Sequence, residues 1–443
     1  MQIELPVKVR MIIQKLEEAG FEAYAVGGCV RDSLLGRTPD DWDITTSANP
    51  YQVKQIFNRT IDTGIQHGTV TVMMDKEGFE VTTYRIDGEY EDSRHPKEVI
   101  FTQNLVEDLK RRDFTINAMA YNDRSGIVDI FGGMEDLQKG IIRCVGVAKE
   151  RFTEDALRIM RAVRFSAQLG YEIEENTKQA IIALAPNLKA ISAERIQTEL
   201  VKLVVSPHPD YLRMAYDLGI TREILPELDA AFETTQNNPH HIYTVGEHQL
   251  QCMKQIRAEK SLRLAALLHD IGKPKTKETD ENGIDHFHGH PAVGEEMAAG
   301  ILRRLKFDND TITKVRKYVR YHDYSIDTTP KAVRRAINKI GEEYFPQVLE
   351  IKRADILAQS LYQREEKEAH LVKVEQLYQE ILAKNQCVSL KTLAITGKDL
   401  MGMGVPQGKE IGVILQKLLE DVMEQPEHNT KEYLSDMVRK DLR

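Results

Sequence analysis

The sequence predicts an α+β domain at the N-terminus, followed by a long all-α remainder. Residues 1–150 mix helical patterns with short, alternating, β-branched runs, whereas strand patterns nearly vanish after residue 150. A chain of 443 residues has room for roughly two to four domains. Its 41% hydrophobic and 29% charged residues are typical of a globular protein with packed cores.

The expected strands and helices follow the hydrophobic pattern. The strands are expected at residues 21–28, 41–48, 68–74 and 78–85. The helices, with apolar residues at i, i+3, i+4 and i+7, are expected at residues 155–170, 176–191, 193–206, 260–273, 365–385 and 410–425.

Composition argues against several classes of protein. No apolar run approaches the ~18 residues that a membrane span needs, and residues 1–20 do not resemble a signal peptide. The four cysteines lie far apart without a CxxC pair, which disfavours a disulfide framework and a thiolate zinc site. We therefore expect a cytoplasmic protein without a membrane partner. The net charge of −9 disfavours a general nucleic-acid binder, although basic clusters occur at 109–114 and 158–165.

A glycine turn follows the first expected strand. Gly27 and Gly28 end that strand, and a helix is expected to begin near Val30. Free N–H groups at a helix N-terminus favour a phosphate, and Arg31 in the first turn would be a further phosphate ligand. An ordinary turn explains the two glycines equally well.

Two aspartates follow this turn. If residues 41–48 form a strand, Asp41 and Asp43 point to the same face, because side chains alternate along a strand. Two such carboxylates repel each other unless a cation neutralises them, and Mg²⁺ prefers this arrangement. Asp40 falls on the other face. Glu80, on a later strand, is either a third carboxylate of this site or an exposed strand residue.

Three motifs in order resemble the bacterial class II tRNA nucleotidyltransferases, the CCA-adding enzymes, whose superfamily includes bacterial poly(A) polymerases. They are "GGCVRDSLLGR…DDWDITTSANP", "DLKRRDFTINAMAYN" and "RFTEDALRIMRAVRFSAQLGY". The resemblance implies a nucleotidyltransferase head with a mixed sheet and helices, followed by an elongated all-α region. It divides the chain into a catalytic head (1–147), a nucleotide-selecting neck (148–206), a body with an HD domain (207–375) and a tRNA-binding tail (376–443).

The resemblance also implies the reaction. The 3′-hydroxyl of tRNA would attack the α-phosphate of CTP or ATP, with Mg²⁺ held by Asp41 and Asp43, and pyrophosphate would leave. Gly28 and Arg31 would hold the triphosphate, and Arg112 would contact the nucleotide. The segment 87–104 matches the family's flexible loop at full length, which favours complete CCA addition, or A addition alone, over CC addition.

The helix after Thr153, its expected N-cap, carries polar residues at every third position: Asp155, Arg158, Arg161 and Arg164. They form either an exposed ion-pair ridge or a device that selects the base. A carboxylate only accepts and a guanidinium only donates, so Asp155 with Arg158 would fit cytosine and adenine but oppose uracil and guanine. Arg161 and Arg164 would then serve the phosphates.

Several histidine motifs resemble the HD phosphohydrolases: "VGEH", "LLHDIGKP", "HGHPAVG" and "RYHD". Histidine and aspartate are ligands for metals such as Mn²⁺ or Ni²⁺, which would be a second cofactor beside Mg²⁺. The last ligand is open, because both His322 and Asp323 are available, and we take Asp323. The expected ligands are His248, His269, Asp270 and Asp323, with His290 nearby.

The favoured hypothesis is a CCA-adding enzyme that uses tRNA, CTP and ATP, as a monomer or homodimer. An A-adding enzyme or poly(A) polymerase is the alternative within the class. The alternative from another class is a metal-dependent HD phosphohydrolase whose N-terminal half only binds RNA. In the tail, Gly404, Pro406, Gly408 and Gly412 form either a tRNA-phosphate contact or an ordinary turn between helices.

Overall fold

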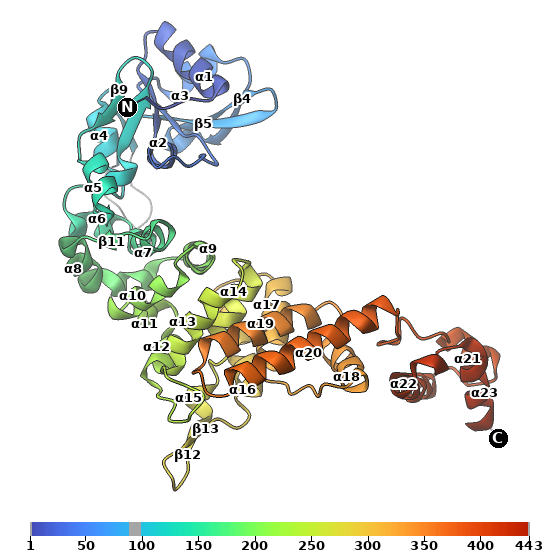
Figure 1. The fold of residues 1–443 in the computed structure, drawn as a ribbon. Coiled ribbons are helices and arrows are strands. Elements are labelled where there is room, and N and C mark those ends of the chain that lie inside the picture. Colours follow the sequence, from blue (N-terminus) through green and yellow to red (C-terminus); the bar gives the residue numbers. More distant parts are fainter. Residues whose placement is uncertain (1, 88–98, 442–443) are drawn as a thin grey trace. The chain divides into compact units, whose positions relative to one another are not determined.

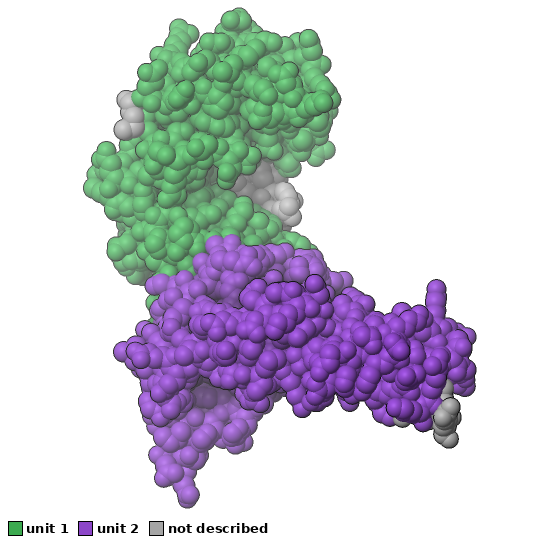
Figure 2. Space-filling view, turned by 45° about the vertical axis from the view of Figure 1, so that its right-hand side comes forward, with its two compact units in different colours: residues 1–226 green, residues 227–443 purple. Residues whose placement is uncertain are grey.

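The computed structural model describes residues 2–87 and 99–441. The chain forms two compact units, residues 1–226 and 227–443, which are coloured separately in Figure 2. The first contains the large sheet, and the second is almost entirely helical (Figure 1), so the predicted α+β region followed by an all-α region is confirmed. The finer division into head, neck, body and tail stays a prediction. Within the described ranges, no helix has both the length and the apolar character needed to cross a bilayer.

The first unit is organised around a seven-stranded sheet in the order β3-β4-β5-β2-β1-β8-β9. β2 and β5 run parallel, while the other neighbours are antiparallel, so the sheet is mixed as expected. The strands of this sheet are β1 (Ala23–Val26), β2 (Ile44–Thr46), β3 (Thr60–Gly64), β4 (Thr69–Met74), β5 (Glu77–Thr83), β8 (Met119–Asn122) and β9 (Gly126–Asp129). Two short ribbons pair β6 (Arg85–Asp87) with β7 (Val99–Phe101) and β10 (Ile141–Ile142) with β11 (Glu172–Ile173).

All four expected strands are present as β1, β2, β4 and β5. The sequence did not predict β3, β8 and β9, because each is short and two of them carry glycine and aspartate, which are depleted in strands. Most of the expected flexible loop, residues 88–98, lies outside the described residues. Its two ends form β6 and β7, which pair with each other.

Helices cover the sheet and continue the first unit. α1 buries Val9, Ile12 and Leu16, which recur at helical spacing. α7 and α9 pack against each other further along the chain. The helices are α1 (Val7–Glu18), α2 (Gly28–Leu34), α3 (Pro50–Ile56), α4 (Leu105–Lys110), α5 (Gly133–Lys139), α6 (Ala148–Glu154), α7 (Leu157–Leu169), α8 (Glu175–Leu184), α9 (Ala193–Val204), α10 (Leu212–Asp217) and α11 (Thr221–Ile224).

The second unit is a helical assembly with one small hairpin, β12 (Glu278–Thr279) and β13 (Asp285–His286). α13 packs on α19, and α16 packs on α17. His248 lies on α13 and His290 begins α16, while His269 and His322 directly follow α14 and α17. Its helices are α12 (Pro226–Glu233), α13 (Val245–Gln255), α14 (Lys260–Leu268), α15 (Lys273–Thr276), α16 (His290–Arg304), α17 (Asn309–Tyr321), α18 (Pro330–Ile340), α19 (Phe345–Ala358), α20 (Arg364–Ala383), α21 (Gly397–Gly402), α22 (Lys409–Glu424) and α23 (Lys431–Asp441).

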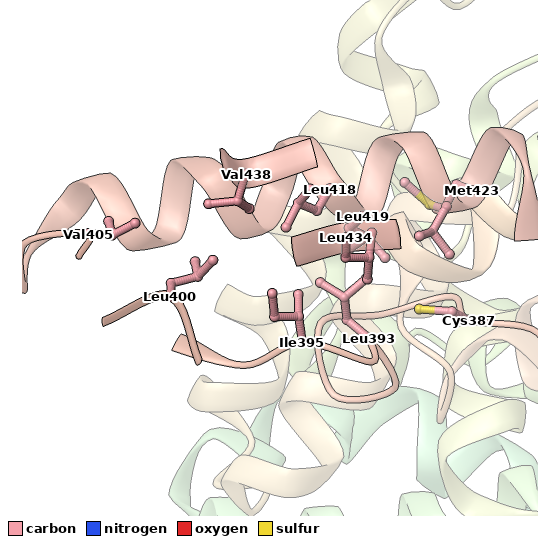
Figure 3. Packing of buried hydrophobic residues seen from close by; sticks show 11 residues of the cluster. Cys387, Leu393, Ile395, Leu400, Val405, Leu418, Leu419, Met423, Leu434 and Val438 are labelled. Carbon is pink, nitrogen blue, oxygen red and sulfur yellow. The ribbon is translucent and has the colours of Figure 1, made fainter. Parts of the chain in front are cut away.

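The expected tail has a hydrophobic core of its own. Figure 3 shows apolar side chains such as Leu400, Leu419 and Leu434 that gather between its helices. Arg334 of α18 is buried and donates to the carbonyl oxygen of Met423 at 2.9 Å, which ties the end of α22 to the neighbouring helix. This core packs the helices of the tail against one another, and the hydrogen bond of Arg334 connects them to α18.

The expected glycine turn of the tail is shorter than its pattern suggested. Gly404 adopts the left-handed conformation in the turn before α22, with φ of 95°. Gly408 immediately precedes α22, but Gly412 lies inside that helix. The turn thus connects α21 to α22.

Candidate functional site

Asp41 and Asp43 lie in the segment that leads into β2. The prediction that both belong to the strand is wrong, since β2 begins at Ile44. The reason is that β1 ends at Val26 and the chain turns into α2, which leaves no partner strand beside residues 41 and 42. The segment is still anchored, because the N–H of Val26 donates to the carbonyl oxygen of Asp43 at 3.0 Å.

The parallel pairing of β2 with β5 brings a third carboxylate to this segment. Ile44 pairs with Val81, so the preceding residues, Asp43 just before β2 and Glu80 within β5, lie beside each other. This neighbour relation could not be read from the sequence, because it depends on which strands pair.

The charges of Asp41, Asp43 and Glu80 act on one another. Burial raises the pKa of Asp43, Arg112 lowers it, and Asp41 raises it further. Burial also raises the pKa of Glu80, and the charges of Asp43 and Asp41 add to this effect. Like charges so placed are relieved by a cation. The ligand atoms are all carboxylate oxygens, which fit a hard ion such as Mg²⁺.

The glycine turn lies next to Arg112. Gly27 has φ of 84°, which favours glycine, and a Cβ at this position would lie 3.1 Å from Nη1 of Arg112, so the two groups are close neighbours. α2 begins at Gly28, two residues earlier than expected. The turn, the start of α2 and Arg112 therefore line one region near the carboxylates.

Arg31 is buried and firmly held. Its Nε and Nη2 donate to the two carboxylate oxygens of Asp32 at 2.9 Å each, and its Nη1 donates to Oδ1 of Asn117 at 2.6 Å. Such a two-pronged ion pair fixes the plane of the guanidinium group. Asp32 is thus the positioning partner of Arg31.

Arg112 is oriented by a buried aspartate that the sequence did not mark. Asp108 of α4 is fully buried and lies 3.5 Å from Arg112 and 2.8 Å from Arg111. Burial raises the pKa of Asp108, but the two arginines outweigh it and hold the pKa below its ordinary value. "LVEDLK" resembles an exposed helix, so only the tertiary structure shows that Asp108 faces inward.

The helix that was expected to begin at Thr153 is broken in two. Thr153 lies inside α6, the chain extends at Asp155, and α7 starts at Leu157, so the expected N-cap is wrong. The carboxylate of Asp155 accepts the N–H of Leu157 at 3.0 Å. Aspartate binds free N–H groups at helix starts in this way, and this competition with the helix explains the break.

Asp155 and Arg158 do not pair with each other. Asp155 accepts from Arg195 of α9 at 2.7 Å. Arg158 donates to the carboxylate of Glu154 at 2.8 Å and to the carbonyl oxygen of Arg111 at 3.0 Å. Both side chains therefore have protein partners in this conformation.

The exposed-ridge explanation of these residues is wrong, because Arg158 and Arg164 are buried. Arg161 forms an ion pair with Asp113 at 2.6 Å, and Arg164 lies 2.6 Å from the carboxylate of Glu199. Burial raises the pKa of Asp113, but Arg161 outweighs it and brings the pKa down to about 2. Buried charges of this kind are stable only when paired.

Phe165 of α7 connects the helix to the glycine turn. Its ring centroid lies 3.8 Å from the guanidinium carbon of Arg164, 5.1 Å from that of Arg31 and 5.2 Å from that of Arg161. These are cation–π distances. One aromatic ring thus places the expected triphosphate contact beside the expected base-selecting helix.

The second unit contains a buried cluster of histidine and aspartate. Among the described residues, two groups have ligand atoms within 4.8 Å of one another: His248, His269 and Asp270, and Asp270, His290 and His322. Asp270 belongs to both groups. Its Oδ2 lies 3.3 Å from Nε2 of His269, while its Oδ1 lies 3.3 Å from Nε2 of His290 and 3.4 Å from Nε2 of His322.

Three of these imidazoles are oriented by the backbone. His269, His290 and His322 each place Nδ1 at 2.7–2.8 Å from the carbonyl oxygen three residues earlier. A carbonyl oxygen only accepts, so Nδ1 carries the proton in the neutral ring and Nε2 keeps its lone pair. Histidines that bind a metal are commonly held in this way. The donor set of nitrogen and carboxylate oxygen fits Mn²⁺ or Ni²⁺.

The structure places His322 in the cluster and leaves Asp323 outside it, exposed to solvent. We therefore replace Asp323 by His322 as a proposed ligand. Asp355 of α19 is a further member that the sequence analysis missed, because "RADILA" has no histidine or motif to mark it. Its Oδ1 lies 2.8 Å from Nε2 of His248. Burial raises the pKa of Asp355, but His248 and His269 reverse this effect and lower it strongly.

Family models match three parts of the chain. They are the poly A polymerase head domain over residues 23–143, the probable RNA and SrmB-binding site of polymerase A over 170–232, and a putative tRNA nucleotidyltransferase domain 2 over 278–438. A CCA-adding enzyme of Lactobacillus helveticus is 37% identical over 441 residues, which cover 97% of both proteins. This chain belongs to the family of CCA-adding enzymes, which are nucleotidyltransferases.

Two further relatives agree with this assignment. A CCA-adding enzyme of Leuconostoc mesenteroides is 55% identical over 199 residues, although this alignment spans only 45% of this chain and 50% of that protein. The crystal structure of a Bacillus stearothermophilus CCA-adding enzyme in complex with CTP is 30% identical. It covers 99% of both chains with a TM-score of 0.71.

Proposed function

We propose that this chain adds C, C and A to the 3′ end of tRNA without a nucleic-acid template, using CTP and ATP and releasing pyrophosphate. The observation that carries the proposal is the convergence of Asp41, Asp43 and Glu80 beside Arg112. The full-length relative and the similar structure solved with CTP support it. A cytoplasmic location is part of the proposal, and the oligomeric state, monomer or homodimer, is left open.

The carboxylates would hold Mg²⁺. Asp41 and Asp43 are its proposed ligands, with Glu80 as the third carboxylate of the site. Bound Mg²⁺ would supply a lower pKa for the attacking 3′-hydroxyl and charge stabilisation for the leaving pyrophosphate. Arg31, Arg112 and the backbone of Gly28 would bind the triphosphate, with Arg31 already fixed by Asp32.

Asp155 and Arg158 are proposed to select the base. Cytosine and adenine each present a donor beside an acceptor, in the order that a carboxylate and a guanidinium can bind, whereas uracil and guanine present the reverse order. Asp155 now pairs with Arg195, and Arg158 pairs with Glu154. A bound base must therefore replace Arg195 as the partner of Asp155 and Glu154 as the partner of Arg158. Arg161 and Arg164 would hold the phosphates or the selecting groups in place.

Primer extension tests the proposal. A tRNA that lacks its CCA end is incubated with CTP, with ATP, or with both, and the products are resolved at single-nucleotide length. We expect two additions with CTP alone and three with both. Incorporation of AMP without CMP would instead identify an A-adding enzyme or poly(A) polymerase and would contradict complete CCA addition.

The histidine cluster supports a second function, a metal-dependent phosphohydrolase in the body. The specific observation is that four imidazoles surround the carboxylate of Asp270, with three Nε2 lone pairs turned inward, and that a second carboxylate, Asp355, contacts His248. The proposed ligands are His248, His269, Asp270, His290, His322 and Asp355, and Mn²⁺ or Ni²⁺ would supply an activated water when bound. Hydrolysis of a phosphomonoester by the full chain, measured with and without Mn²⁺, tests this function. The alternative that the whole protein is only a phosphohydrolase is not favoured, because the head carries its own carboxylate site.

A further inference from the structure

A buried amide lies between the proposed triphosphate site of the head and helix α7. Asn117 ends the short 3₁₀ helix Thr115–Asn117, and only 6% of its surface is exposed. A buried amide needs partners for both its carbonyl oxygen and its NH₂ group, because an unpaired polar group in the interior costs free energy. The partners of Asn117 therefore decide how its side chain is oriented.

The two ends of this amide contact groups of opposite charge. Oδ1 of Asn117 accepts a hydrogen bond from Nη1 of Arg31 at 2.6 Å, and Nδ2 of Asn117 donates to Oδ1 of Asp113 at 3.2 Å. A guanidinium group only donates and a carboxylate only accepts, so a side chain between them must offer one acceptor and one donor. The amide of asparagine meets this requirement, whereas a carboxylate in its place would repel Asp113.

Asp113 continues this connection to α7. Its Oδ2 accepts from Nε of Arg161 at 2.8 Å and lies 2.6 Å from Nη2 of the same side chain. Its Oδ1 also accepts the N–H of Phe114 at 2.8 Å, so the carboxylate has little freedom to turn. An unbroken series of hydrogen bonds thus runs from α2 through Asn117 and Asp113 to α7.

The ring of Phe165 closes this series of contacts. Its centroid lies 5.1 Å from the guanidinium carbon of Arg31 and 5.2 Å from that of Arg161, so the two arginines at the ends of the series share one aromatic side chain. Without the amide of Asn117, Arg31 would keep its bonds to Asp32 and its contact with the ring, but its Nη1 would lose the short bond that fixes that side of the group.

We propose that Asn117 is a positioning residue for the triphosphate. Its amide fixes the direction in which Arg31 presents its remaining N–H groups, and through Asp113 it ties Arg31 to α7, the helix proposed to select the base. A guanidinium group has more N–H donors than the bonds to Asp32 and Asn117 use, so Arg31 keeps donors for a phosphate. This inference rests on the proposed triphosphate site and assigns Asn117 a role that acts through Arg31.

Calorimetry with tripolyphosphate and Mg²⁺ tests this role on the full-length protein without any reaction. We expect Asn117→Ala to weaken the binding of tripolyphosphate about tenfold, because a hydrogen bond to a charged group is lost. Asn117→Ser keeps a polar group that is too short to reach both partners, so it should weaken binding in the same direction and serves if Asn117→Ala does not fold. Unchanged affinity in these variants would overturn the inference. If wild type binds no tripolyphosphate, the proposed triphosphate site is overturned, and this inference with it.

Asn122→Ala is the matched control. Asn122 is a buried amide on β8 in the same unit. Its Nδ2 donates to the carbonyl oxygen of Ala23 at 3.0 Å and to Glu17 at 3.1 Å, and its Oδ1 accepts the N–H of Ser125 at 2.7 Å. This variant loses an equally buried amide, but none of these bonds involves an arginine, so tripolyphosphate affinity should stay unchanged. An equal loss in both variants would reduce the role of Asn117 to support of the fold and overturn the inference.

A double-variant cycle tests the link from Arg31 to α7. If Asn117 carries the influence of Asp113, Asp113→Asn should weaken tripolyphosphate binding about threefold in wild type and should have no further effect beside Asn117→Ala. Effects that simply add would overturn the link through Asn117.

Primer extension separates positioning from a loss of folded enzyme. Asn117→Ala should raise KM for CTP and for ATP by the same factor while kcat changes less than about threefold, because Arg31 serves the triphosphate that both nucleotides share. A fall in kcat with both KM values unchanged would mean that less of the enzyme is folded, and it would overturn the positioning role.

Discussion

In the two candidate metal sites, the surroundings shift the pKa values of the carboxylates in opposite directions. In the head, burial and mutual repulsion raise the pKa of Asp43 and of Glu80. In the body, burial also raises the pKa of Asp270, but His269 and Lys273 outweigh it and lower the pKa far below its ordinary value. The head site therefore has a negative charge that no neighbouring side chain fully neutralises. In the body site, His269 and Lys273 neutralise the charge of the central carboxylate, Asp270.

The ligand atoms differ in the same sense. The head offers carboxylate oxygens near an exposed segment, which fits an ion that arrives with the triphosphate of its substrate. The body offers inward nitrogens fixed by backbone carbonyls, which fits a resident transition-metal ion. The comparison predicts separate sites in one chain for an ion that arrives with the substrate and for a permanently bound ion.

The largest expected effect is on nucleotide incorporation in the head. Asp43→Ala removes a proposed Mg²⁺ ligand, so we expect the rate of CMP addition to fall by roughly 10³-fold or more, as metal-ion catalysis contributes several kcal/mol. Single-turnover primer extension measures the rate. Asp40→Ala, next to the site but exposed, should remain active. Full activity of Asp43→Ala would remove the head as the catalytic site.

The next largest effect concerns Mn²⁺ binding, which should depend on the body site and not on the head site. Asp270→Asn should weaken Mn²⁺ binding by roughly 100-fold, because the shared carboxylate and its charge are lost. In wild type, Mn²⁺ at 100 times its Kd should stabilise the fold by about 2.7 kcal/mol, which thermal unfolding detects. Asp43→Ala should keep this Mn²⁺ stabilisation. Its loss in Asp43→Ala instead would mean that the body site is not the main Mn²⁺ site.

The sequence predicted the fold better than the contacts. Alternation and helical spacing located β1, β2, β4 and β5, and short motifs marked Asp41 and His269. Glu80 beside Asp43 depends on the pairing of β2 with β5, which no local pattern encodes. Asp108 and Asp355 lie on helices that look ordinary in sequence, because a carboxylate gives no sign of whether it faces solvent or a buried partner such as an arginine or a histidine.

A third prediction concerns stability in the head, where one carboxylate behaves like those of the body. The pKa of Asp113 falls from 3.8 to about 2, which corresponds to about 2 kcal/mol of stability at neutral pH. Because the pKa is lower in the folded state, this contribution is present above pH 4 and is lost as the pH falls from about 4 to about 2. Asp113→Asn should therefore reduce the free energy of unfolding at pH 7.

Urea unfolding of wild type and Asp113→Asn between pH 7 and pH 3 measures this difference. The gap between the two proteins should narrow below pH 4, when Asp113 begins to take up a proton. A gap that stays constant over this range would show that the ion pair with Arg161 does not set the stability of this region.

The smallest expected effect concerns the proposed selection of the base by Asp155. Asp155→Asn replaces an acceptor by an amide that can also donate, so it should no longer oppose uracil. The preference for CTP over UTP is the ratio of their kcat/KM values. We expect this ratio to fall about tenfold, because the hydrogen bonds that distinguish the two bases are lost. Asp217→Asn, which alters an exposed pair with Arg213 in the same unit, should keep the preference. An equal loss of activity with both nucleotides would assign Asp155 a structural role through Leu157 and Arg195, because removing a support weakens both substrates alike.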